Sequence, residues 1–85
     1  MKTIREGNKL IVDIHGLRTE PAKFRLEATI NGCSEKITEI VVIHGFNQGQ
    51  ALKEMVKGLV SSKITNISPS LLNDGQTVIS LRRKK

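Results

Sequence analysis

The fold is decided by residues 37–60, which read ITEIVVIHGFNQGQALKEMVKGLV and change from one hydrophobic period to another. Ile40–Ile43 is an unbroken β-branched run, which is typical of a central, well-buried strand. After a glycine-containing loop, a helix is expected from about Gln50. Its apolar side chains recur at helical spacing, at Leu52, Met55, Val56, Leu59 and Val60. This stretch therefore predicts a strand followed by an amphipathic helix.

The same order occurs earlier in the chain. The segment 10–15 alternates as a strand does and ends at Gly16, and its two faces are formed by Leu10, Val12 and Ile14 and by Ile11, Asp13 and His15. A helix is expected to follow, with Thr19 as its N-cap and Pro21 in its first turn, where the missing N–H loses no partner. The apolar stripe of that helix consists of Ala22, Leu26 and Ile30.

The remaining segments complete the order βαβαββ. Residues 64–67 and 77–81 predict two strands that pair antiparallel across a loop at 69–75, which contains the turn sequence Asn73-Asp74-Gly75. Right-handed crossovers place both helices on one face, so we expect an α/β two-layer sandwich with a mixed four-stranded sheet. Its other face stays partly open. Residues 1–9 are expected to be a flexible leader or a short edge strand, 10–82 the domain, and 83–85 a basic tail.

Composition limits the function classes. The 85 residues suffice for one small domain and no second one. The single cysteine, Cys33, excludes an internal disulfide and a cysteine-rich zinc site. No apolar run reaches the roughly 18 residues of a membrane-spanning helix, and the N-terminus lacks the apolar stretch of a signal peptide. We expect a cytoplasmic monomer without a membrane partner.

The charge is strongly basic and uneven. The net charge is +6; residues 1–50 carry 7 basic and 6 acidic side chains, whereas residues 51–85 carry 7 and 2. Such a balance suits a polyanion such as DNA or RNA, although a solvated basic tail explains it equally well. Phe24 and Phe46 are the only aromatic residues, which argues against base-stacking platforms and favours contacts to phosphates.

Two motifs could carry chemistry. Asp13 and His15 project from one side of a strand at its C-terminal end, where they could form a general base or hold a cation, or simply a surface pair. His44 and Gly45 end the next strand, and the loop up to Gly49 leads into a helix N-terminus. That arrangement could bind an anion with help from Lys53, or be an ordinary turn. Parallel neighbouring strands would place both motifs along one rim.

These residues resemble the Smr (small MutS-related) domain family over about residues 10–82, as a bare domain. The resemblance rests on LIVDIHGL at 10–17, Ala22 and Leu26, IHG at 43–45, Gly49 with Leu52-Lys53, and Gly75-x-Thr77-Val78. It implies a two-layer βαβαββ sandwich like the C-terminal domain of bacterial translation initiation factor three. It also implies DNA or RNA binding, and several family members nick or cleave their nucleic acid.

Within the resemblance, Asp13, His15 and Gly16 match the family's Leu-Asp-Leu-His-Gly motif, and His44-Gly45 the start of its His-Gly-x-Gly loop. The chain departs from the family after that point. The family usually has a basic residue and a second glycine there, whereas this chain has Phe46 and Asn47. The loop therefore lacks one charge and some backbone freedom, which bears on cleavage more than on fold.

The leading hypothesis is that the chain is a nucleic-acid-binding domain and a candidate endonuclease. Asp13 and His15 would activate water or bind Mg²⁺ or Mn²⁺, and His44 would act as the acid. Phosphates would meet Gly16, Gly45, Gly49, Lys53, Lys57, Arg82 and Arg83. The alternatives are a non-catalytic nucleic-acid-binding module and a protein-interaction domain. The choice between DNA and RNA, the structure preference and the pathway stay open.

Overall fold

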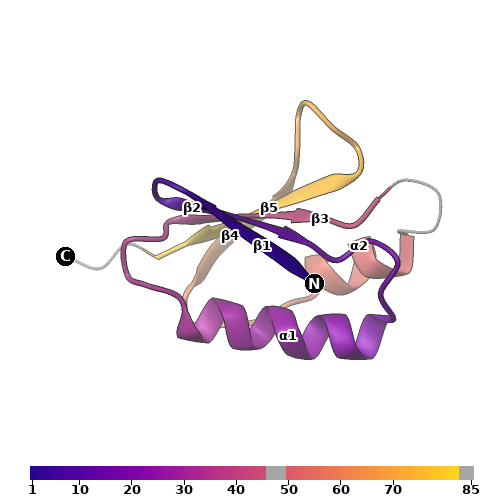
Figure 1. The fold of residues 1–85 in the computed structure, drawn as a ribbon, viewed down its shortest axis with the longest axis horizontal. Coiled ribbons are helices and arrows are strands. Elements are labelled where there is room, and N and C mark those ends of the chain that lie inside the picture. The colour runs from indigo at the N-terminus through magenta and orange to yellow at the C-terminus, as the bar shows by residue number, and fades with distance from the viewer. Residues whose placement is uncertain (46–49, 83–85) are drawn as a thin grey trace.

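The computed structural model describes residues 1–45 and 50–82. The elements, in chain order, are β1 (Lys2–Glu6), β2 (Lys9–Asp13), α1 (Thr19–Gly32), β3 (Glu39–Ile43), α2 (Gln50–Lys57), β4 (Ile64–Pro69) and β5 (Gln76–Leu81). Both helices lie on one side of the sheet (Figure 1). The predicted two-layer α/β architecture is confirmed.

The sheet has five strands in the order β1-β2-β3-β5-β4, where four were predicted. Strands β2 and β3 pair in parallel, as the crossover through α1 requires. Strand β5 inserts between β3 and β4 and is antiparallel to both, so the predicted antiparallel pairing of the last two strands is confirmed.

Of the two alternatives for residues 1–9, a flexible leader or a short edge strand, the structure shows the edge strand. Residues 2–6 form β1, which pairs antiparallel with β2 through a two-residue turn at Gly7-Asn8. Gly7 has a φ of 60°, in the left-handed region that this type of turn needs. Every residue of β1 is exposed, so no hydrophobic alternation marks it in the sequence. The strand is held by its backbone pairing, which places Lys2 opposite Asp13.

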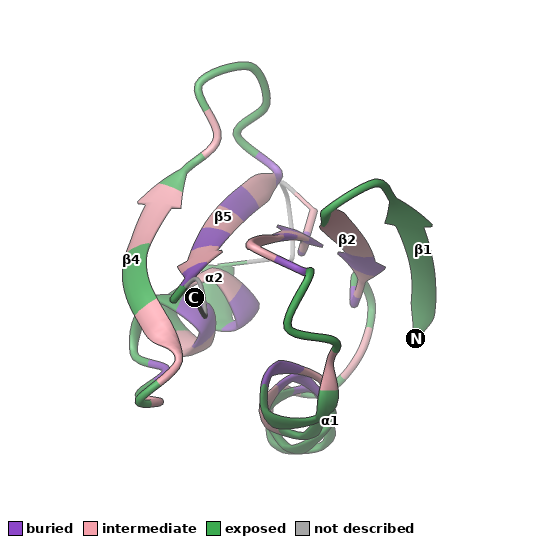
Figure 2. Cartoon of the chain, turned by 90° about the vertical axis from the view of Figure 1, so that its left-hand side faces the viewer, coloured by how far each residue is buried: buried purple, intermediate pink, exposed green. Residues whose placement is uncertain are grey.

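The core lies between the sheet and the helices (Figure 2). Its buried apolar residues are Val12, Ile14, Ala22, Leu26, Ile30, Ile37, Ile40, Val42, Leu52, Val56, Leu59, Ile79 and Leu81. The β3 run alternates instead of being buried throughout: Ile40 and Val42 are buried, while Val41 and Ile43 are half-buried. The reason is that helices cover one face of the sheet only.

Helix α1 buries the predicted stripe, but its start differs from the prediction. Thr19 is the first helical residue, and the N-cap is Arg18, whose side chain makes no capping hydrogen bond. Helix α2 is shorter than its apolar pattern suggests and ends at Lys57, before Gly58. Leu59 still reaches the core from the following turn, but Val60 is 89% exposed, so the prediction of a buried Val60 is wrong. Met55 is partly buried against the core.

The loop between β4 and β5 has the predicted turn chemistry. The side-chain Oδ1 of Asn73 accepts a hydrogen bond from the backbone N–H of Gly75 at 2.8 Å. No helix in the described ranges is long and apolar enough to span a membrane.

Candidate active site

Asp13 and His15 form a bonded pair at the C-terminal end of β2. Nδ1 of His15 lies 2.5 Å from Oδ1 of Asp13. The backbone N–H of His15 donates to the same oxygen at 3.1 Å. Gly16, with a φ of 79°, turns the chain directly afterwards. The ring is thus fixed through one nitrogen, and Nε2 points away from the carboxylate.

The electrostatics of the pair keep Asp13 ionised. Burial of the carboxylate raises its pKa, but the hydrogen bonds from the ring and backbone of His15, with the nearby charges of His15 and Lys2, outweigh burial and hold the pKa below the usual 3.8. An ionised carboxylate at Nδ1 favours the tautomer that carries its proton there. In neutral His15 the unprotonated nitrogen is then Nε2, on a side chain that is 67% exposed. The arrangement suits a general base.

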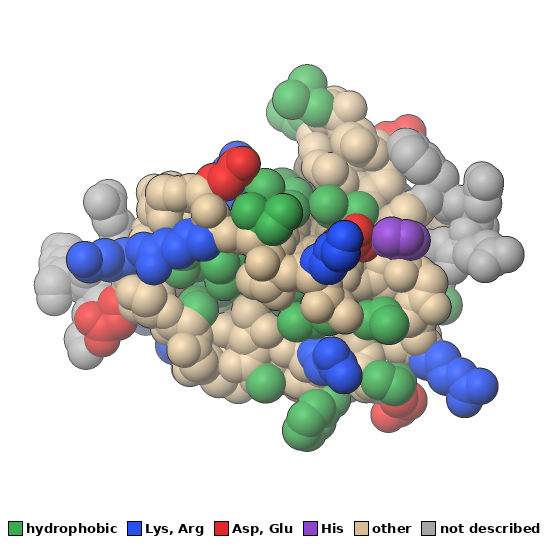
Figure 3. Space-filling model, viewed as in Figure 1, with side chains coloured by type: hydrophobic (Ala, Val, Ile, Leu, Met, Phe, Trp, Pro, Cys, Tyr) green, Lys and Arg blue, Asp and Glu red, His purple; other side chains and the backbone are tan. Residues whose placement is uncertain are grey.

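Lys2 belongs to this site, although it was not predicted from the sequence. It lies opposite Asp13 in the β1–β2 register and contributes to the low pKa of that carboxyl. Together with Met1, Asp13, His15 and Leu17 it lines a shallow cavity of about 200 Å³. Figure 3 shows a histidine at this surface, beside an acidic and a basic side chain. The Gly7-Asn8 turn was the signal that could have revealed it, because it fixes the register of β1.

His44 does not join the exposed pair. It follows β3 beside Ile14, and both are buried on the helix side of the sheet, whereas Asp13 and His15 alternate to the open side. Nδ1 of His44 lies 3.0 Å from the carbonyl oxygen of Gly45, which can only accept a hydrogen bond, so this nitrogen carries a proton. Nε2 lies 2.9 Å from the hydroxyl of Thr77. His44 therefore lies at the same end of the sheet as Asp13 and His15 but faces the helix side, so it is not exposed beside them.

Gly45 and Gly75 bring two backbone segments close together beside His15. The carbonyl oxygen of Gly75 accepts hydrogen bonds from the N–H groups of His44, at 2.9 Å, and Gly45, at 3.1 Å. The N–H of Gly45, predicted to meet a phosphate, is thus already bonded within the protein. A side chain at Gly75 would come within 3.4 Å of the backbone of Gly45, so the two segments approach closely. Gly49, Phe46 and Asn47 lie outside the described residues.

The predicted basic residues lie at two ends of the molecule. Lys53 is in the first turn of α2, which begins shortly after β3 ends beside Asp13, and Lys57 is exposed in the last turn of that helix. Arg82 follows β5 at the other end of the sheet, about five strand residues or roughly 16 Å away. Arg83 lies outside the described residues.

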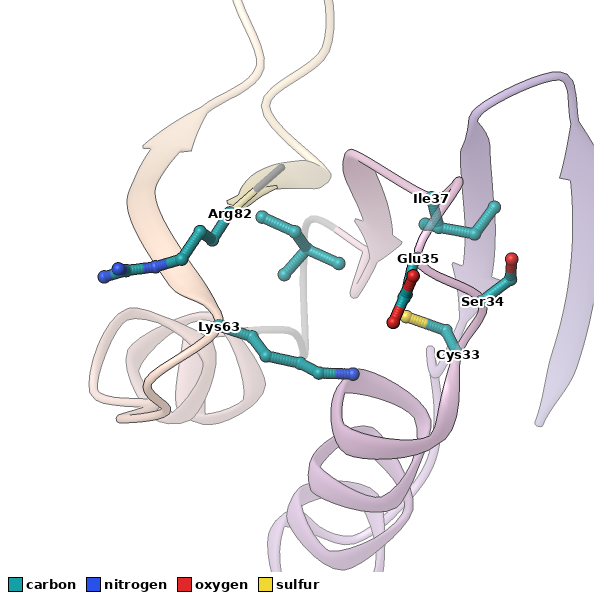
Figure 4. A pocket seen from close by; sticks show the side chains of 7 residues that line it. Cys33, Ser34, Glu35, Ile37, Lys63 and Arg82 are labelled. Carbon is teal, nitrogen blue, oxygen red and sulfur yellow. The ribbon is translucent and has the colours of Figure 1, made fainter. Parts of the chain in front are cut away.

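The end of the sheet at Arg82 contains a separate cavity of about 280 Å³, lined by Cys33, Ser34, Glu35, Ile37, Lys63, Leu81 and Arg82. Figure 4 shows Lys63 extending across it toward the end of α1, while Arg82 points away from it. Nζ of Lys63 donates to the carbonyl oxygen of Asn31 at 3.1 Å. The structure therefore does not bring Arg82 to the Asp13–His15 pair.

Asp13 and His15, the predicted metal ligands, offer few of the donors that the predicted ions prefer. Mg²⁺ and Mn²⁺ prefer oxygen donors, and of the pair only Asp13 supplies them. One of its oxygens already accepts both hydrogen bonds from His15. Over residues 1–45 and 50–82, no three His, Cys, Asp or Glu side chains gather as a metal site would require. The described side chains therefore do not by themselves supply the ligands of a divalent ion.

A family model and a solved structure both relate this chain to the Smr domain. The sequence model of the Smr domain family matches residues 12–82. The fold is similar to the crystal structure of the Smr domain of Thermus thermophilus MutS2, with a TM-score of 0.68 and 20% sequence identity over 85% of this chain and 96% of that one. No curated protein matches the chain.

Proposed function

Because the chain belongs to the Smr domain family, we propose that it binds nucleic acid at the Asp13–His15 end of the sheet and cleaves a phosphodiester bond there. The observation that carries the proposal is the pair itself. Asp13 holds one ring nitrogen of His15 and leaves the other on an exposed side chain. A base oriented by a carboxylate is the arrangement that general base catalysis uses.

The proposed step transfers one proton and exchanges one bond. Nε2 of His15 takes the proton of an attacking hydroxyl, either water or the 2′-hydroxyl of RNA. That oxygen then bonds to phosphorus, the bond to the leaving oxygen breaks, and the leaving oxygen takes a proton from the imidazolium or from solvent. Lys2, opposite Asp13, supplies positive charge for the phosphate.

A divalent ion enters this proposal only with the substrate. Asp13 would hold it through the oxygen that His15 does not use, and the ion would supply charge neutralisation at the phosphate. His15 keeps its role as base in either case, because its ring is oriented by the protein alone.

A binding module without catalysis is the second candidate. The burial of His44 favours it, because that side chain is 2% exposed and has both ring nitrogens in hydrogen bonds. His15 is then the only exposed imidazole of the chain to serve as both acid and base.

Labelled DNA and RNA, each single-stranded and duplex, separate the candidates. The wild type is incubated with each probe in Mg²⁺, in Mn²⁺ and in chelator, and both binding and products are measured. We expect cleavage of at least one probe, and Asp13→Asn should lower it at least about tenfold while binding changes little. The matched control is Glu6→Gln, which changes an exposed carboxylate on the neighbouring strand β1 and should cleave normally. Binding without products would establish the non-catalytic module.

A further inference from the structure

The loop between β4 and β5 carries two leucines that pack against nothing. The side chains of Leu71 and Leu72 are 98% and 97% exposed. Burying a leucine normally stabilises a protein, so two adjacent ones held in water make no contribution to this fold. In Figure 3, hydrophobic side chains stand at the tip of the loop, clear of the surrounding surface. Such a tip suits contact with another molecule.

The loop is held in shape by its own hydrogen bonds. The backbone N–H of Ser70 donates to the carbonyl oxygen of Gln76 at 3.2 Å, and that of Gln76 donates to Asn73 at 3.2 Å. The N–H of Leu72 donates to the hydroxyl of Ser70 at 3.3 Å, and the Asn73 side chain accepts from Gly75. These bonds close the base of the loop and cross its tip, so the leucines are presented in a defined direction.

The base of the loop is part of the candidate active site. The carbonyl oxygen of Gly75 accepts from the N–H groups of His44 and Gly45, and Gly45 in turn lies against His15. The loop rises from the sheet on the side opposite the helices (Figures 1 and 2). Asp13 and His15 face that same open side. A polymer bound over the pair would therefore meet the leucines.

We propose that Leu71 and Leu72 form a wedge that inserts between neighbouring bases of the nucleic acid held at the Asp13–His15 pair. This inference rests on the proposed function. Proteins that open a base step commonly insert leucine or similar apolar side chains between the bases. The cost of unstacking is lowest where bases are already unpaired. The wedge then favours nucleic acid with an unpaired base over a continuous duplex.

The chemistry of the surroundings favours nucleic acid over a protein groove as the partner. The base of the loop is bonded to Gly45, which lies against the exposed His15, and the chain has a net charge of +6. A polyanion is attracted to that surface, and apolar insertion adds contacts that phosphates cannot provide.

The test uses a duplex with one unpaired base, labelled beside it with 2-aminopurine, and the matching continuous duplex. The fluorescence of 2-aminopurine rises when its base unstacks. The wild type should raise it on the bulged probe and bind that probe more tightly than the duplex. Leu71→Ala with Leu72→Ala should abolish the rise and weaken bulge binding about tenfold, since two apolar side chains lose their burial. Leu71→Met with Leu72→Met should retain both effects.

The matched control is Phe24→Ala with Val60→Ala, because these side chains are also exposed, at 74% and 89%, but lie outside the loop. This control should bind both probes as the wild type does. Equal binding of the bulged probe by wild type and double alanine variant would overturn the wedge while leaving nucleic-acid binding intact. Failure of the wild type to bind any nucleic acid would overturn the proposed function, and the wedge with it.

Discussion

Asp13 should stabilise the folded protein as well as orient His15. Because its pKa is lowered, this stabilisation should depend on pH. A carboxyl whose pKa is lower in the folded state stabilises the protein above its unfolded pKa, and that stabilisation disappears as the pH falls through the folded value. The pKa of Asp13 lies below the usual 3.8, so its contribution should be complete at pH 7 and lost at more acidic pH.

Asp13→Asn should therefore be less stable than wild type at pH 7, by up to about 1 kcal/mol for this partly exposed pair. The difference should vanish toward pH 2. Urea denaturation of both proteins between pH 2 and 7 measures it, with Glu6→Gln as the control. A difference that stays constant across this range would show that the pair does not stabilise the fold through charge.

His44 offers a second test at this scale, through its partner Thr77. The hydroxyl of Thr77 is buried and lies 2.9 Å from Nε2 of His44. Thr77→Val keeps the shape but leaves that nitrogen without a partner, which should cost about 1–3 kcal/mol of unfolding free energy. Thr65→Val is the matched control, because the hydroxyl of Thr65 is exposed and donates to Ser80 at 3.2 Å. Equal stability of the two variants would mean that the His44–Thr77 bond contributes nothing.

The two histidines show what a sequence can predict of a site. Strand alternation correctly predicted that Asp13 and His15 share a side. The same alternation, applied across the parallel register, places His44 beside Ile14 and so on the buried side. His15 and His44 therefore follow the ends of neighbouring strands but face opposite sides of the sheet. The bond from Gly45 to Gly75 could not be predicted, because it depends on where β5 pairs.

Among the secondary-structure elements, the end of helix α2 leaves two adjacent residues in different environments, one buried and one exposed. Leu59 is 6% exposed and Val60 is 89% exposed. Leu59→Ala should lower the free energy of unfolding by about 2–5 kcal/mol, because it removes buried methyl groups and leaves a cavity. Val60→Ala should change it by less than about 0.5 kcal/mol. Similar losses for both variants in urea denaturation would contradict the end of α2 at Lys57.

The elements were predictable where their hydrophobic period was strong. The buried residues of α1 and the alternation of β2 were predicted from the sequence, although Thr19 is the first helical residue of α1 and not its N-cap. The apolar pattern of α2 overran the helix, because Gly58 ends it and Leu59 reaches the core without being helical. Strand β1 has no buried face, so no alternation of apolar and polar residues marks it in the sequence. The Gly7-Asn8 turn was its sequence signal.

For the whole molecule, the proposed binding to nucleic acid should depend on salt, because the basic residues would contact phosphates. Each phosphate contact should contribute about 0.7–0.9 to the slope of log affinity against log salt concentration. Lys2→Ala should lower the slope by about one contact, and deletion of residues 82–85 should lower it further if the bound strand reaches the far end of the sheet. Lys23→Ala, on the exposed side of α1, should leave the slope unchanged. If Lys2→Ala had the same salt slope as the wild type, Lys2 would not contact a phosphate of the bound nucleic acid.

In the proposed cleavage His15 moves the proton, and single-turnover cleavage by His15→Ala with added imidazole measures that role. This substitution removes an exposed side chain, so the fold should persist. We expect His15→Ala to bind the substrate nearly as the wild type does and to cleave it at least about a hundredfold more slowly. Imidazole should restore part of the rate in proportion to its concentration. Undiminished cleavage by His15→Ala, or no cleavage by the wild type of any DNA or RNA probe, would contradict the account.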